Sequence, residues 1–532
     1  MVRPLGFLIL IFINTLVLGC KLDDDALRGN LHGNPSSPSI SPDPITFTFP
    51  STLNINESVG GPFSPGINSQ PNSFSISPSL PSGMIMNSET GEISGAPTEY
   101  KALTEYTLTA HFSKKDISTS FSFLVQKYIQ VSSSMNADDS DASIGDNSCD
   151  NGSGQCTLRA AIEEANYNYG QFQTTIDLST GTYNLTTPIN ITREMNLNGS
   201  GAGSTIIDGQ NLTNIIYASG SYNLEISGVT LQNGIQSSQL GGAAVYKSFG
   251  QLTLRNCSID SNTSSSPTYG GGGVLARNSN LIIDNCTLIN NTVSGAGKDG
   301  GAIHVIVGTA NIKNSFFYNN NSSAGSGGGV TFRDSSGDID SCTFELNIGA
   351  ARGGAIYSWG NSVSAINVKN TTFHNNASVG FDGKEIATLH TTNMDLNLYF
   401  NTFYSDDSIN KPLIEISGGG FKIFANIFSD NVAASNCSYV NSPVVTSLGY
   451  NLDSDTSCAA ASDDLSGSPT FSGGLSLNSG STKNFLQSMG SIGHDVIPKA
   501  SCEVYSSVDQ RDLPRFSDSL GDMCDIGSTE LQ

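Results

Sequence analysis

Gly300-Gly301-Ala302-Ile303, followed by Asn314-Ser315-Phe316-Phe317, is one copy of a pattern that occurs five times between Gly241 and Asn376. Each copy has a glycine-rich step that leads into Val or Ile, and then a short strand-like segment that ends near a Cys, Ser or Thr. That last residue stands at positions 257, 286, 315, 342 and 371, so the spacing is 29, 29, 27 and 29 residues. A period in this range is typical of a solenoid, in which each copy forms one coil that stacks on the next.

The repeats favour one kind of solenoid over the others. The period is too long for leucine-rich repeats, and helical repeats need amphipathic helices that these copies do not have. We therefore predict an all-β protein in which residues 170–430 form a right-handed parallel β-helix of about nine coils. Val, Ile, Leu and Phe are expected to stack inside it. The Asn residues at the corner before the Cys/Ser/Thr column are expected to bond from coil to coil.

Composition limits the classes of function. The chain has 532 residues, 57 of them Gly, and a formal charge of −23, with only 13% charged residues. This length predicts several domains, and the high Gly content with few charges predicts many turns. Nucleic acid and anionic membrane surfaces would be repelled by the net charge, whereas cations such as calcium are the natural small partners.

The N-terminus reads as a targeting segment. Arg3 precedes a short apolar stretch, Leu5 to Leu18, which runs into Leu16-Val17-Leu18-Gly19-Cys20. This string resembles the bacterial lipobox, which implies a signal peptide over 1–19 and a diacylated Cys20 at the mature N-terminus. Residues 20–42 are then a flexible tether, and the residue after Cys20 favours the outer membrane and the cell surface. An ordinary signal peptide with a coincidental Cys is the alternative.

Residues 43–128 are predicted to form a separate β-sandwich. Apolar residues alternate with polar ones in Ile45–Phe49, Tyr106–Ala110 and Phe121–Val125, as in half-buried strands. Between them lie Leu80-Pro81-Ser82-Gly83-Met84 and the string Thr90-Gly91-Glu92-Ile93-Ser94-Gly95-Ala96-Pro97. Both strings resemble the bacterial Ig-like, cadherin-like sandwich family, whose members serve as spacers or binding modules. We prefer the spacer.

Residues 131–169 are predicted to form a junction with a short capping helix. Leu158, Ala161, Ile162 and Ala165 recur at helical spacing after a possible N-cap, Thr157, and such a helix would cover the open end of the solenoid. The segment resembles the CSLREA domain that precedes bacterial β-helices, although Thr157 and Ala160 depart from its pattern. Its acidic loop is either solvated or a calcium site, calcium being the one cofactor considered. The candidate ligands are Asp138, Asp139, Asp141, Asp146 and Asp150.

The repeats also resemble those of polymorphic outer-membrane proteins. Gly353-Gly354-Ala355-Ile356 matches one signature of that family, and Phe344-Glu345-Leu346-Asn347 and Phe373-His374-Asn375-Asn376 match the other, Phe-x-x-Asn. The resemblance implies a surface-exposed protein, because several members of the family are adhesins. Here the lipid at Cys20 is expected to be the anchor.

Residues 431–532 are predicted to cover the far end of the rod. Asp509-Gln510-Arg511-Asp512-Leu513-Pro514-Arg515 and Cys524-Asp525-Ile526-Gly527-Ser528-Thr529-Glu530 resemble the choice-of-anchor Q domain, with departures at Ser528 and Thr529.

Cysteine spacing predicts three disulfides. Cysteines that lie close together in irregular segments are plausible pairs in an oxidising compartment. These pairs are Cys149/Cys156, Cys437/Cys458 and Cys502/Cys524. Cys257, Cys286 and Cys342 share one phase of the repeat, so they are expected to be free, buried thiols.

The sequence leaves three functions open. We prefer a surface lipoprotein whose rod serves adhesion by binding carbohydrate or a host-matrix protein. The alternatives are a polysaccharide lyase or hydrolase of the same fold, and a purely structural surface component. Arg333 stands near Asp334, Asp338 and Asp340, but the blocks typical of polygalacturonases are missing, so we expect these carboxylates to be turn and surface residues. A groove with three or more carboxylates and a basic residue would favour the enzyme, and a flat face with aromatic residues or Asn ladders would favour binding.

Overall fold

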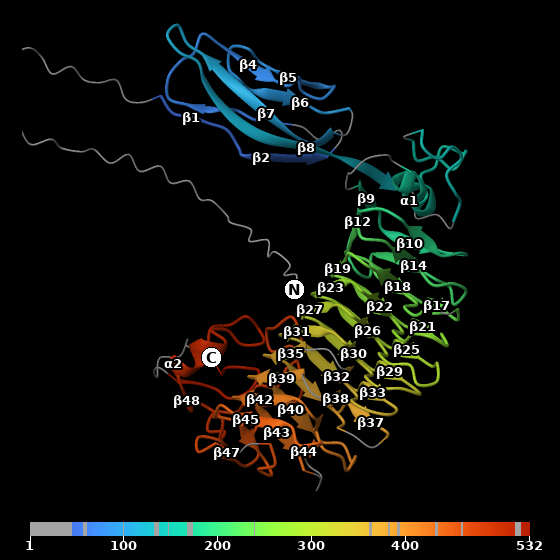
Figure 1. Ribbon diagram of the computed structural model, residues 1–532, viewed down its shortest axis with the longest axis vertical. Coiled ribbons are helices and arrows are strands. Elements are labelled where there is room, and N and C mark those ends of the chain that lie inside the picture. Colours follow the sequence, from blue (N-terminus) through green and yellow to red (C-terminus); the bar gives the residue numbers. More distant parts are fainter. Residues whose placement is uncertain are drawn as a thin grey trace, which may run out of the picture.

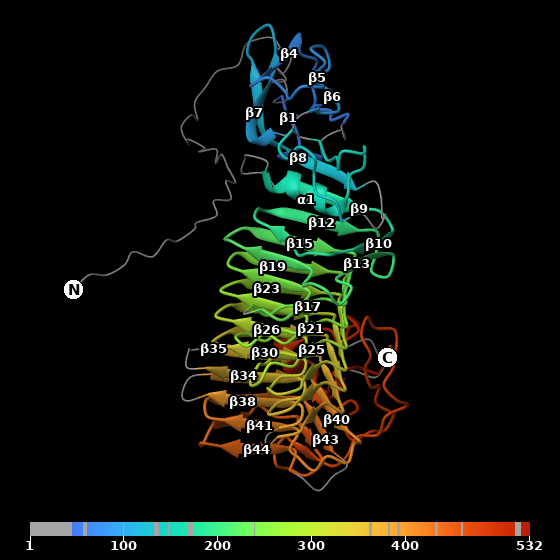
Figure 2. The ribbon, with the colours of Figure 1, turned by 90° about the vertical axis from the view of Figure 1, so that its right-hand side faces the viewer.

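The computed structural model describes residues 45–56, 61–98, 101–131, 138–146, 148–167, 174–238, 240–360, 364–380, 383–390, 394–430, 435–458, 461–515 and 523–531. The predicted signal segment 1–19, Cys20 and the tether 20–42 lie outside these residues. The described chain forms a small β-sandwich, a long rod of stacked coils, and a C-terminal segment along the flank of the later coils (Figures 1 and 2). Almost all of it is β-structure, which confirms the predicted class. No helix in this part of the chain is both long enough and apolar enough to cross a bilayer.

The sandwich is organised around two long antiparallel strands. β7 pairs with β8 and with β4, and β2 runs parallel to β8. Tyr106, Phe121 and Phe123 are buried between the layers, as the alternating pattern predicted. The strands of the sandwich are β1 (Phe47–Thr48), β2 (Thr52–Asn56), β3 (Gly66–Ile67), β4 (Ser73–Ser77), β5 (Met84–Met86), β6 (Ile93–Gly95), β7 (Lys101–His111) and β8 (Ile117–Val131).

One strand belongs to both the sandwich and the rod. The first part of β8 pairs with β7, and its last residues, Lys127 to Val131, pair in parallel with β9 (Thr174–Leu178). The boundary that we predicted at residue 128 therefore falls inside a continuous strand. Because the hydrogen-bonded sheet runs on from one unit into the other, the sandwich is joined to the rod by a strand rather than by a flexible linker.

The rod consists of coils that contribute strands to four parallel sheets. The first sheet begins with the sandwich strands β4, β7 and β8; we call it the groove sheet, because its outer face carries the groove described in the next subsection. It continues through β9, β12 (Met195–Gly199), β15 (Asn223–Ser227), β19 (Gln251–Arg255), β23 (Asn280–Asp284), β27 (Thr309–Lys313), β31 (Ser336–Asp340), β35 (Ser364–Lys369), β39 (Met394–Tyr399), β42 (Gly420–Phe424) and β45 (Val444–Ser447).

In each of the five repeats, the strand of the second sheet begins directly after the Cys, Ser or Thr at positions 257, 286, 315, 342 and 371. Its strands are β10 (Gly181–Asn184), β13 (Thr205–Asp208), β16 (Thr230–Gln232), β20 (Ser258–Asp260), β24 (Thr287–Ile289), β28 (Phe316–Tyr318), β32 (Thr343–Glu345), β36 (Thr372–His374), β40 (Thr402–Ser405), β43 (Ile427–Asp430), β46 (Leu452–Asp453) and β47 (Leu465–Ser466).

The remaining two sheets complete each coil. The third contains β11 (Ile189–Ile191), β14 (Ile216–Ser219), β18 (Val245–Ser248), β22 (Val274–Arg277), β26 (Ile303–Ile306), β30 (Val330–Arg333), β34 (Ile356–Gly360), β38 (Ile386–His390), β41 (Ile414–Ser417) and β44 (Cys437–Val440). The fourth, shorter one contains β17 (Ile235–Gln236), β21 (Thr263–Ser264), β25 (Thr292–Val293), β29 (Asn321–Ser322), β33 (Ile348–Gly349) and β37 (Ala377–Ser378).

Like side chains stack inside the rod, as the repeat predicted. Phe317, Phe344, Phe373, Phe403 and Phe428 form a column in which adjacent rings are stacked at centroid distances between 4.5 and 5.3 Å. All of these rings are fully buried. Burial of aromatic rings in offset stacks supplies hydrophobic stabilisation to every coil interface of this part.

The glycine-rich step serves two purposes at the coil corner. Gly300 has a φ of +78°, which an L-residue rarely adopts. A Cβ on the next residue, Gly301, would lie 2.3 Å from the carbonyl oxygen of Gly328 in the following coil. The step therefore allows the turn at its first position and the close approach of two backbones at its second.

A buried asparagine ladder runs through a column other than the predicted one. Asn262, Asn291, Asn320, Asn347 and Asn376 are each fully buried, and each Nδ2 donates to Oδ1 of the next at 2.7–3.0 Å. These are the asparagines of the Phe-x-x-Asn strings and their equivalents. At the expected corner, Asn285 does bond Asn256, but at an exposed position. The ladder ends where the carboxyl group of Glu385 replaces the next amide and accepts from Asn376.

The predicted helix covers the first coil. α1 (Leu158–Tyr167) buries Leu158, Ala161, Ile162 and Ala165, the four residues of its predicted apolar face. Thr157 caps it, because its Oγ1 accepts from the backbone N of Ala160 at 3.1 Å. The helix contacts β8, β9 and β11 at the start of the rod, which protects the apolar end of the solenoid from water.

The C-terminal segment lies along the rod rather than across its end. Residues 435–466 finish the last coils, and the chain then runs back beside the second sheet (Figure 2). Gln510 donates to the carbonyl of Cys342 at 2.9 Å, and Arg515 donates to Oδ1 of Asn370 at 3.0 Å. The structure therefore differs from the expected end cap, because the polar groups of this segment bond to the side of coils that precede it by more than 100 residues.

Candidate functional site

A groove on the outer face of the groove sheet is the main candidate site. It lies over β27, β31, β35 and β39 and is walled on one side by α2 (Lys499–Tyr505), with a volume of about 430 Å³. Because alternate residues of a strand face outward, the outward side chains of neighbouring coils line up in columns along the groove. The lining residues are Asn311, Lys313, Asp338, Ile339, Asp340, Asn367, Lys369, Tyr399, Val504 and Tyr505.

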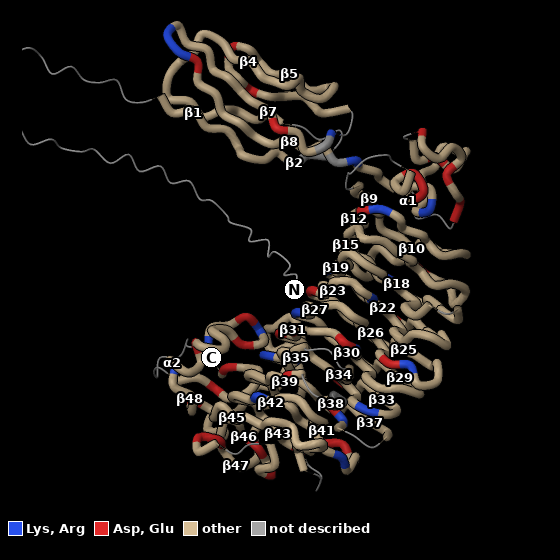
Figure 3. Tube along the Cα trace, in the orientation of Figure 1, with Lys and Arg blue, Asp and Glu red and all other residues tan. Residues whose placement is uncertain are grey.

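A column of alternating charge runs along the groove sheet, and three of its members, Lys313, Asp340 and Lys369, line the groove. In register along the rod stand Arg255, Asp284, Lys313, Asp340 and Lys369. Arg255 lies 2.9 Å from Asp284, and Lys369 lies 3.2 Å from Asp340. Figure 3 shows basic and acidic residues taking turns along β23, β27, β31 and β35. The column, which we call the charge ladder, presents a basic group or a carboxylate at each coil.

A second column carries amides. Asn311, Asp338, Asn367 and Asn397 occupy matching positions on successive strands. Asn367 donates to Asp338 at 2.8 Å, and Asn397 donates to Asn367 at the same distance. This amide ladder holds its side chains in a fixed orientation and still leaves hydrogen-bonding atoms facing the groove, since Asn311 and Asp338 are exposed.

Aromatic side chains form the wall of the groove. The rings of Tyr399 and Tyr505 stack with their centroids 5.0 Å apart, and Tyr505 also lies 4.3 Å from Phe424. Burial raises the pKa of the Tyr399 hydroxyl above its ordinary value. Val504 projects next to them and is 71% exposed. The groove therefore combines a polar floor with a wall of two tyrosines and an exposed valine.

The C-terminal strings that we singled out hold this wall against the rod. Arg511 pairs with Asp509 at 2.6 Å and donates to the carbonyl of Glu530. The fully buried Arg515 lies over the ring of Phe400 at 3.9 Å and donates to the carbonyl of Gly527 at 3.0 Å. Both strings thus form one buried network that fixes the segment carrying α2. We assign them this structural role.

The carboxylates considered for catalysis do not converge with an arginine. Asp338 and Asp340 lie in the groove, but Arg333 is on the third sheet, where its guanidinium covers the ring of Trp359 at 4.5 Å. His304 is also on the third sheet and is 4% exposed, and burial lowers its pKa to about 3. Within the described residues the groove has two carboxylates and two lysines, fewer carboxylates than our criterion for an enzyme required.

The acidic loop near α1 uses its carboxylates to organise the junction. Asp138 forms a bidentate ion pair with Arg159, with N–O distances of 2.8 and 2.9 Å. It also accepts a hydrogen bond from the backbone N of Thr186 at 2.7 Å. The other four carboxylates accept hydrogen bonds within the loop: Asp139 from Asn151, Asp141 from Ser143, Asp146 from Ser148, and Asp150 from Gly152 and Gly154. The calcium site at these five residues stays a prediction.

The three disulfides are present as predicted. Cys149 bonds Cys156, Cys437 bonds Cys458, and Cys502 bonds Cys524. The last of these joins α2 to β49 (Met523–Cys524), so it fixes the helix that walls the groove. The buried cysteines of the repeat, Cys257, Cys286 and Cys342, are free thiols, which also agrees with the prediction.

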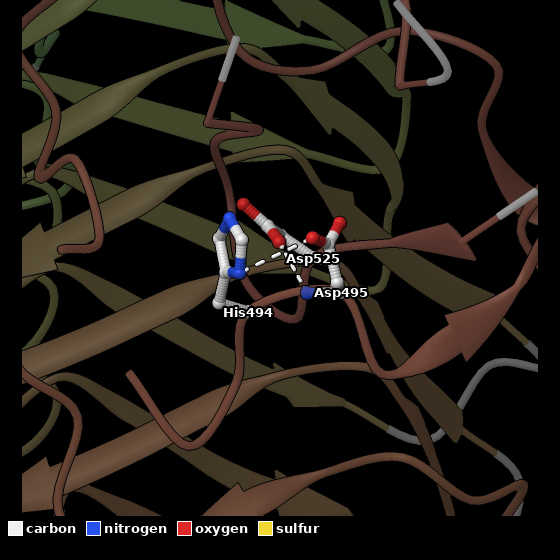
Figure 4. Close-up of side chains that lie close together, drawn as sticks. All are labelled: His494, Asp495 and Asp525. Atoms are coloured by element: carbon white, nitrogen blue, oxygen red, sulfur yellow. Dashed lines mark hydrogen bonds and ion pairs between the residues drawn. The ribbon is translucent and has the colours of Figure 1, made fainter. Parts of the chain in front are cut away.

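A second cluster of functional side chains lies in the C-terminal segment. His494, Asp495 and Asp525 meet at a point where the chain before α2 approaches β49 (Figure 4). Sequence reasoning missed this cluster, because 30 residues separate its members. It also missed the groove lysines and tyrosines. The lysines were recoverable, because the residue just before each corner Asn or Ser of the repeat alternates in charge from Arg255 to Lys369.

Comparison with known proteins matches the sandwich to a described family. The family described as "Putative Ig domain" matches residues 32–126, which confirms the predicted Ig-like unit. No curated protein matches the chain.

Three solved structures resemble it at low identity. PfbA, a surface adhesin of Streptococcus pneumoniae, is 11% identical with a TM-score of 0.34, over 61% of this chain and 92% of PfbA. A family 28 exopolygalacturonase of Yersinia enterocolitica is 11% identical with a TM-score of 0.28, over 76% and 98%. The pectin methylesterase PemA of Erwinia chrysanthemi is 10% identical with a TM-score of 0.27, over 64% and 92%. Likenesses at this level leave the function of the chain open.

Proposed function

We propose that this protein is a lipid-anchored surface protein whose rod binds carbohydrate in the groove between the groove sheet and α2. The observation that carries the proposal is the pairing of a charge ladder and an amide ladder on the floor with Tyr505 and Val504 on the wall. Sugar hydroxyls need donors and acceptors in fixed positions, and the apolar faces of sugar rings pack on aromatic side chains. The groove supplies both within one site.

The repeat also bears on the shape of the ligand. Strands of neighbouring coils lie about 4.8 Å apart, so an amide or charged side chain recurs at that interval along the rod. A linear polysaccharide that runs parallel to the rod axis would meet a hydrogen-bonding side chain at each coil, with basic and acidic groups alternating along the charge ladder. This supports an extended chain as the ligand rather than a single small sugar.

The lipid anchor supports a role at the cell surface. The lipobox string ending in Cys20 and the acidic net charge are both compatible with display outside the cell. With the lipid at the N-terminus, the tether and the sandwich would stand between the membrane and the rod. The sandwich then serves as the spacer, because β8 continues from it directly into the first coil.

A polysaccharide-degrading enzyme is the second candidate, since Asp338 and Asp340 lie in the same groove. Hydrolysis of a glycosidic bond requires two carboxyl groups that are free to act on the substrate. Here Asp338 accepts from Asn367, and Asp340 accepts from Asn370 at 3.2 Å and from Ser341 at 3.1 Å. Because both carboxylates are engaged by the ladders, we favour binding over catalysis.

A panel of glycans and matrix proteins, probed with residues 43–532, tests the proposal. We expect retention of a polysaccharide, and loss of that retention in Tyr505→Ala. Tyr439→Ala is the matched control, because Tyr439 is 38% exposed and lies on β44, away from the groove. A reducing-sugar release assay on the same panel runs beside it. Release of product would favour the enzyme, and binding that Tyr505→Ala leaves unchanged would contradict the proposed site.

A further inference from the structure

His494, Asp495 and Asp525 are arranged as ligands around a common point. One ligand atom from each side chain lies within 4.8 Å of the other two. Nδ1 of His494 is 3.3 Å from Oδ2 of Asp495, and the backbone N of Asp495 donates to Oδ1 of Asp525 at 2.8 Å (Figure 4). In the part of the chain that the structure describes, no other group of three or more His, Cys, Asp or Glu side chains meets this distance criterion.

Asp525 is held rigidly in this position. It is fully buried, and its Oδ2 accepts from the backbone N of Leu531 at 2.7 Å. The neighbouring Cys524 is fixed by its disulfide to Cys502. His494 and Asp495 have side chains that are 16% and 26% exposed, so the cluster is reachable from solvent on one side. A buried anchor with a solvent-facing side suits an ion that keeps a water ligand.

A buried network of charged side chains adjoins the cluster. Asp495 and Asp525 interact electrostatically with each other and with Glu530, and the guanidinium group of Arg515 interacts with Asp509, Asp525 and Glu530. Arg511 is 2.6 Å from Asp509, and Arg515 is 3.8 Å from Glu530. A cation at the cluster would interact favourably with the carboxylates of Asp495 and Asp525, and unpaired charge is costly where a side chain is as buried as that of Asp525.

We propose that His494, Asp495 and Asp525 bind a divalent metal ion of the zinc class, which ties the chain before α2 to β49. The imidazole decides the class of metal, because calcium takes oxygen ligands almost exclusively, whereas zinc accepts nitrogen together with carboxylate oxygen. Three protein ligands leave one position of a tetrahedral site for water. This inference is independent of the proposed carbohydrate site.

Isothermal titration of the EDTA-treated, dialysed protein with ZnCl₂ tests the proposal. We expect one zinc ion per chain, and a loss of affinity of at least about tenfold in both His494→Gln and Asp495→Asn. His111→Gln is the matched control, since His111 pairs with Asp116 on the sandwich. Its zinc affinity should equal that of the wild type.

Thermal melting separates loss of the site from loss of the fold. Without metal, His494→Gln should melt as the metal-free wild type does, and added zinc should raise the melting temperature of the wild type but not that of the variant. The proposal is overturned if the wild type shows no saturable zinc binding, if His494→Gln binds zinc as tightly as the wild type, or if calcium saturates the site and zinc does not.

Discussion

Removing one amide from the middle of the buried ladder should destabilise the rod out of proportion to the size of the change. Asn320 is fully buried, and its Nδ2 donates to the carbonyl of Leu288 at 2.8 Å and to Oδ1 of Asn347 at 2.9 Å. Its Oδ1 accepts from both the backbone N and Nδ2 of Asn291 at 3.0 Å. The substitution Asn320→Ala therefore removes four hydrogen bonds and leaves buried donors of Asn291 without an acceptor.

The magnitude follows from these contacts. At about 1 kcal/mol for each hydrogen bond, the loss in the free energy of unfolding is about 4 kcal/mol. For a folding unit of this size, 1 kcal/mol corresponds to about 2 °C, so the melting temperature should fall by about 8 °C. Thermal unfolding followed by far-UV circular dichroism measures the shift.

The adjacent residue offers a matched control. Asn319 is exposed and makes one side-chain bond of 2.8 Å to Asn290, and its φ of +53° suits glycine. Asn319→Gly should change the free energy of unfolding by less than about 1 kcal/mol. If Asn320→Ala melted within 2 °C of Asn319→Gly, the ladder could not be a main source of stability between the coils, and the reasoning would be refuted.

Two further predictions concern pH and the disulfides. Burial raises the pKa of Glu385 to about 8 from an ordinary value of 4.5, so the folded state keeps a proton that the unfolded chain releases. The stability that this proton contributes is present below pH 4.5 and is lost as the pH rises through about 8. In a plot of melting temperature against pH from 5 to 9, Glu385→Gln should therefore flatten the decline. An unchanged slope of that plot would contradict the assignment. The double variant Cys437→Ser/Cys458→Ser removes a disulfide between residues 21 positions apart in the sequence. A denaturant titration should show a free energy of unfolding that is lower by about 3 kcal/mol. A decrease of less than about 1 kcal/mol would argue against a stabilising role for this disulfide.

The repeat made the coil predictable, because its chemistry is local. A glycine with positive φ at Gly300, close backbone approach at Gly301 and a buried phenylalanine at Phe317 all lie within one coil, so each copy shows the same constraints. The helix before the repeats was equally predictable from the sequence, since its amphipathic pattern lies within its own ten residues. The disulfides at short spacing belong to the same class of local signal.

The docked C-terminal segment and the groove could not be predicted from the sequence, because they depend on contacts between residues far apart in the chain. Gln510 bonds to the carbonyl of Cys342, 168 positions away, and nothing in either segment indicates the other. The groove exists only because this docking brings Tyr505 against Tyr399. The continuity of β8 was hidden for another reason, because the alternating pattern of a strand is the same in a sandwich and in a solenoid.

The asparagine ladder shows how a correct physical idea can be assigned to the wrong column. Two sets of asparagines recur with the same period, at 256, 285 and 314 and at 262, 291 and 320. Only packing decides which set faces inward, and the positive φ of Asn256, Asn285 and Asn314 places the first set at an exposed corner. Of these two sets, the one that follows the buried apolar residue by three positions bonds inside.

A binding isotherm for the groove tests the central claim most directly. The measurement is the Kd of wild type, Lys369→Ala and Lys298→Ala for the polysaccharide that the panel retains. Lys369 belongs to the charge ladder and lines the groove, whereas Lys298 precedes the third-sheet strand β26 and lies outside the groove lining. We predict at least tenfold weaker binding for Lys369→Ala, about 1.4 kcal/mol, with Lys298→Ala equal to wild type. Equal affinities for all three proteins would contradict a carbohydrate site in the groove.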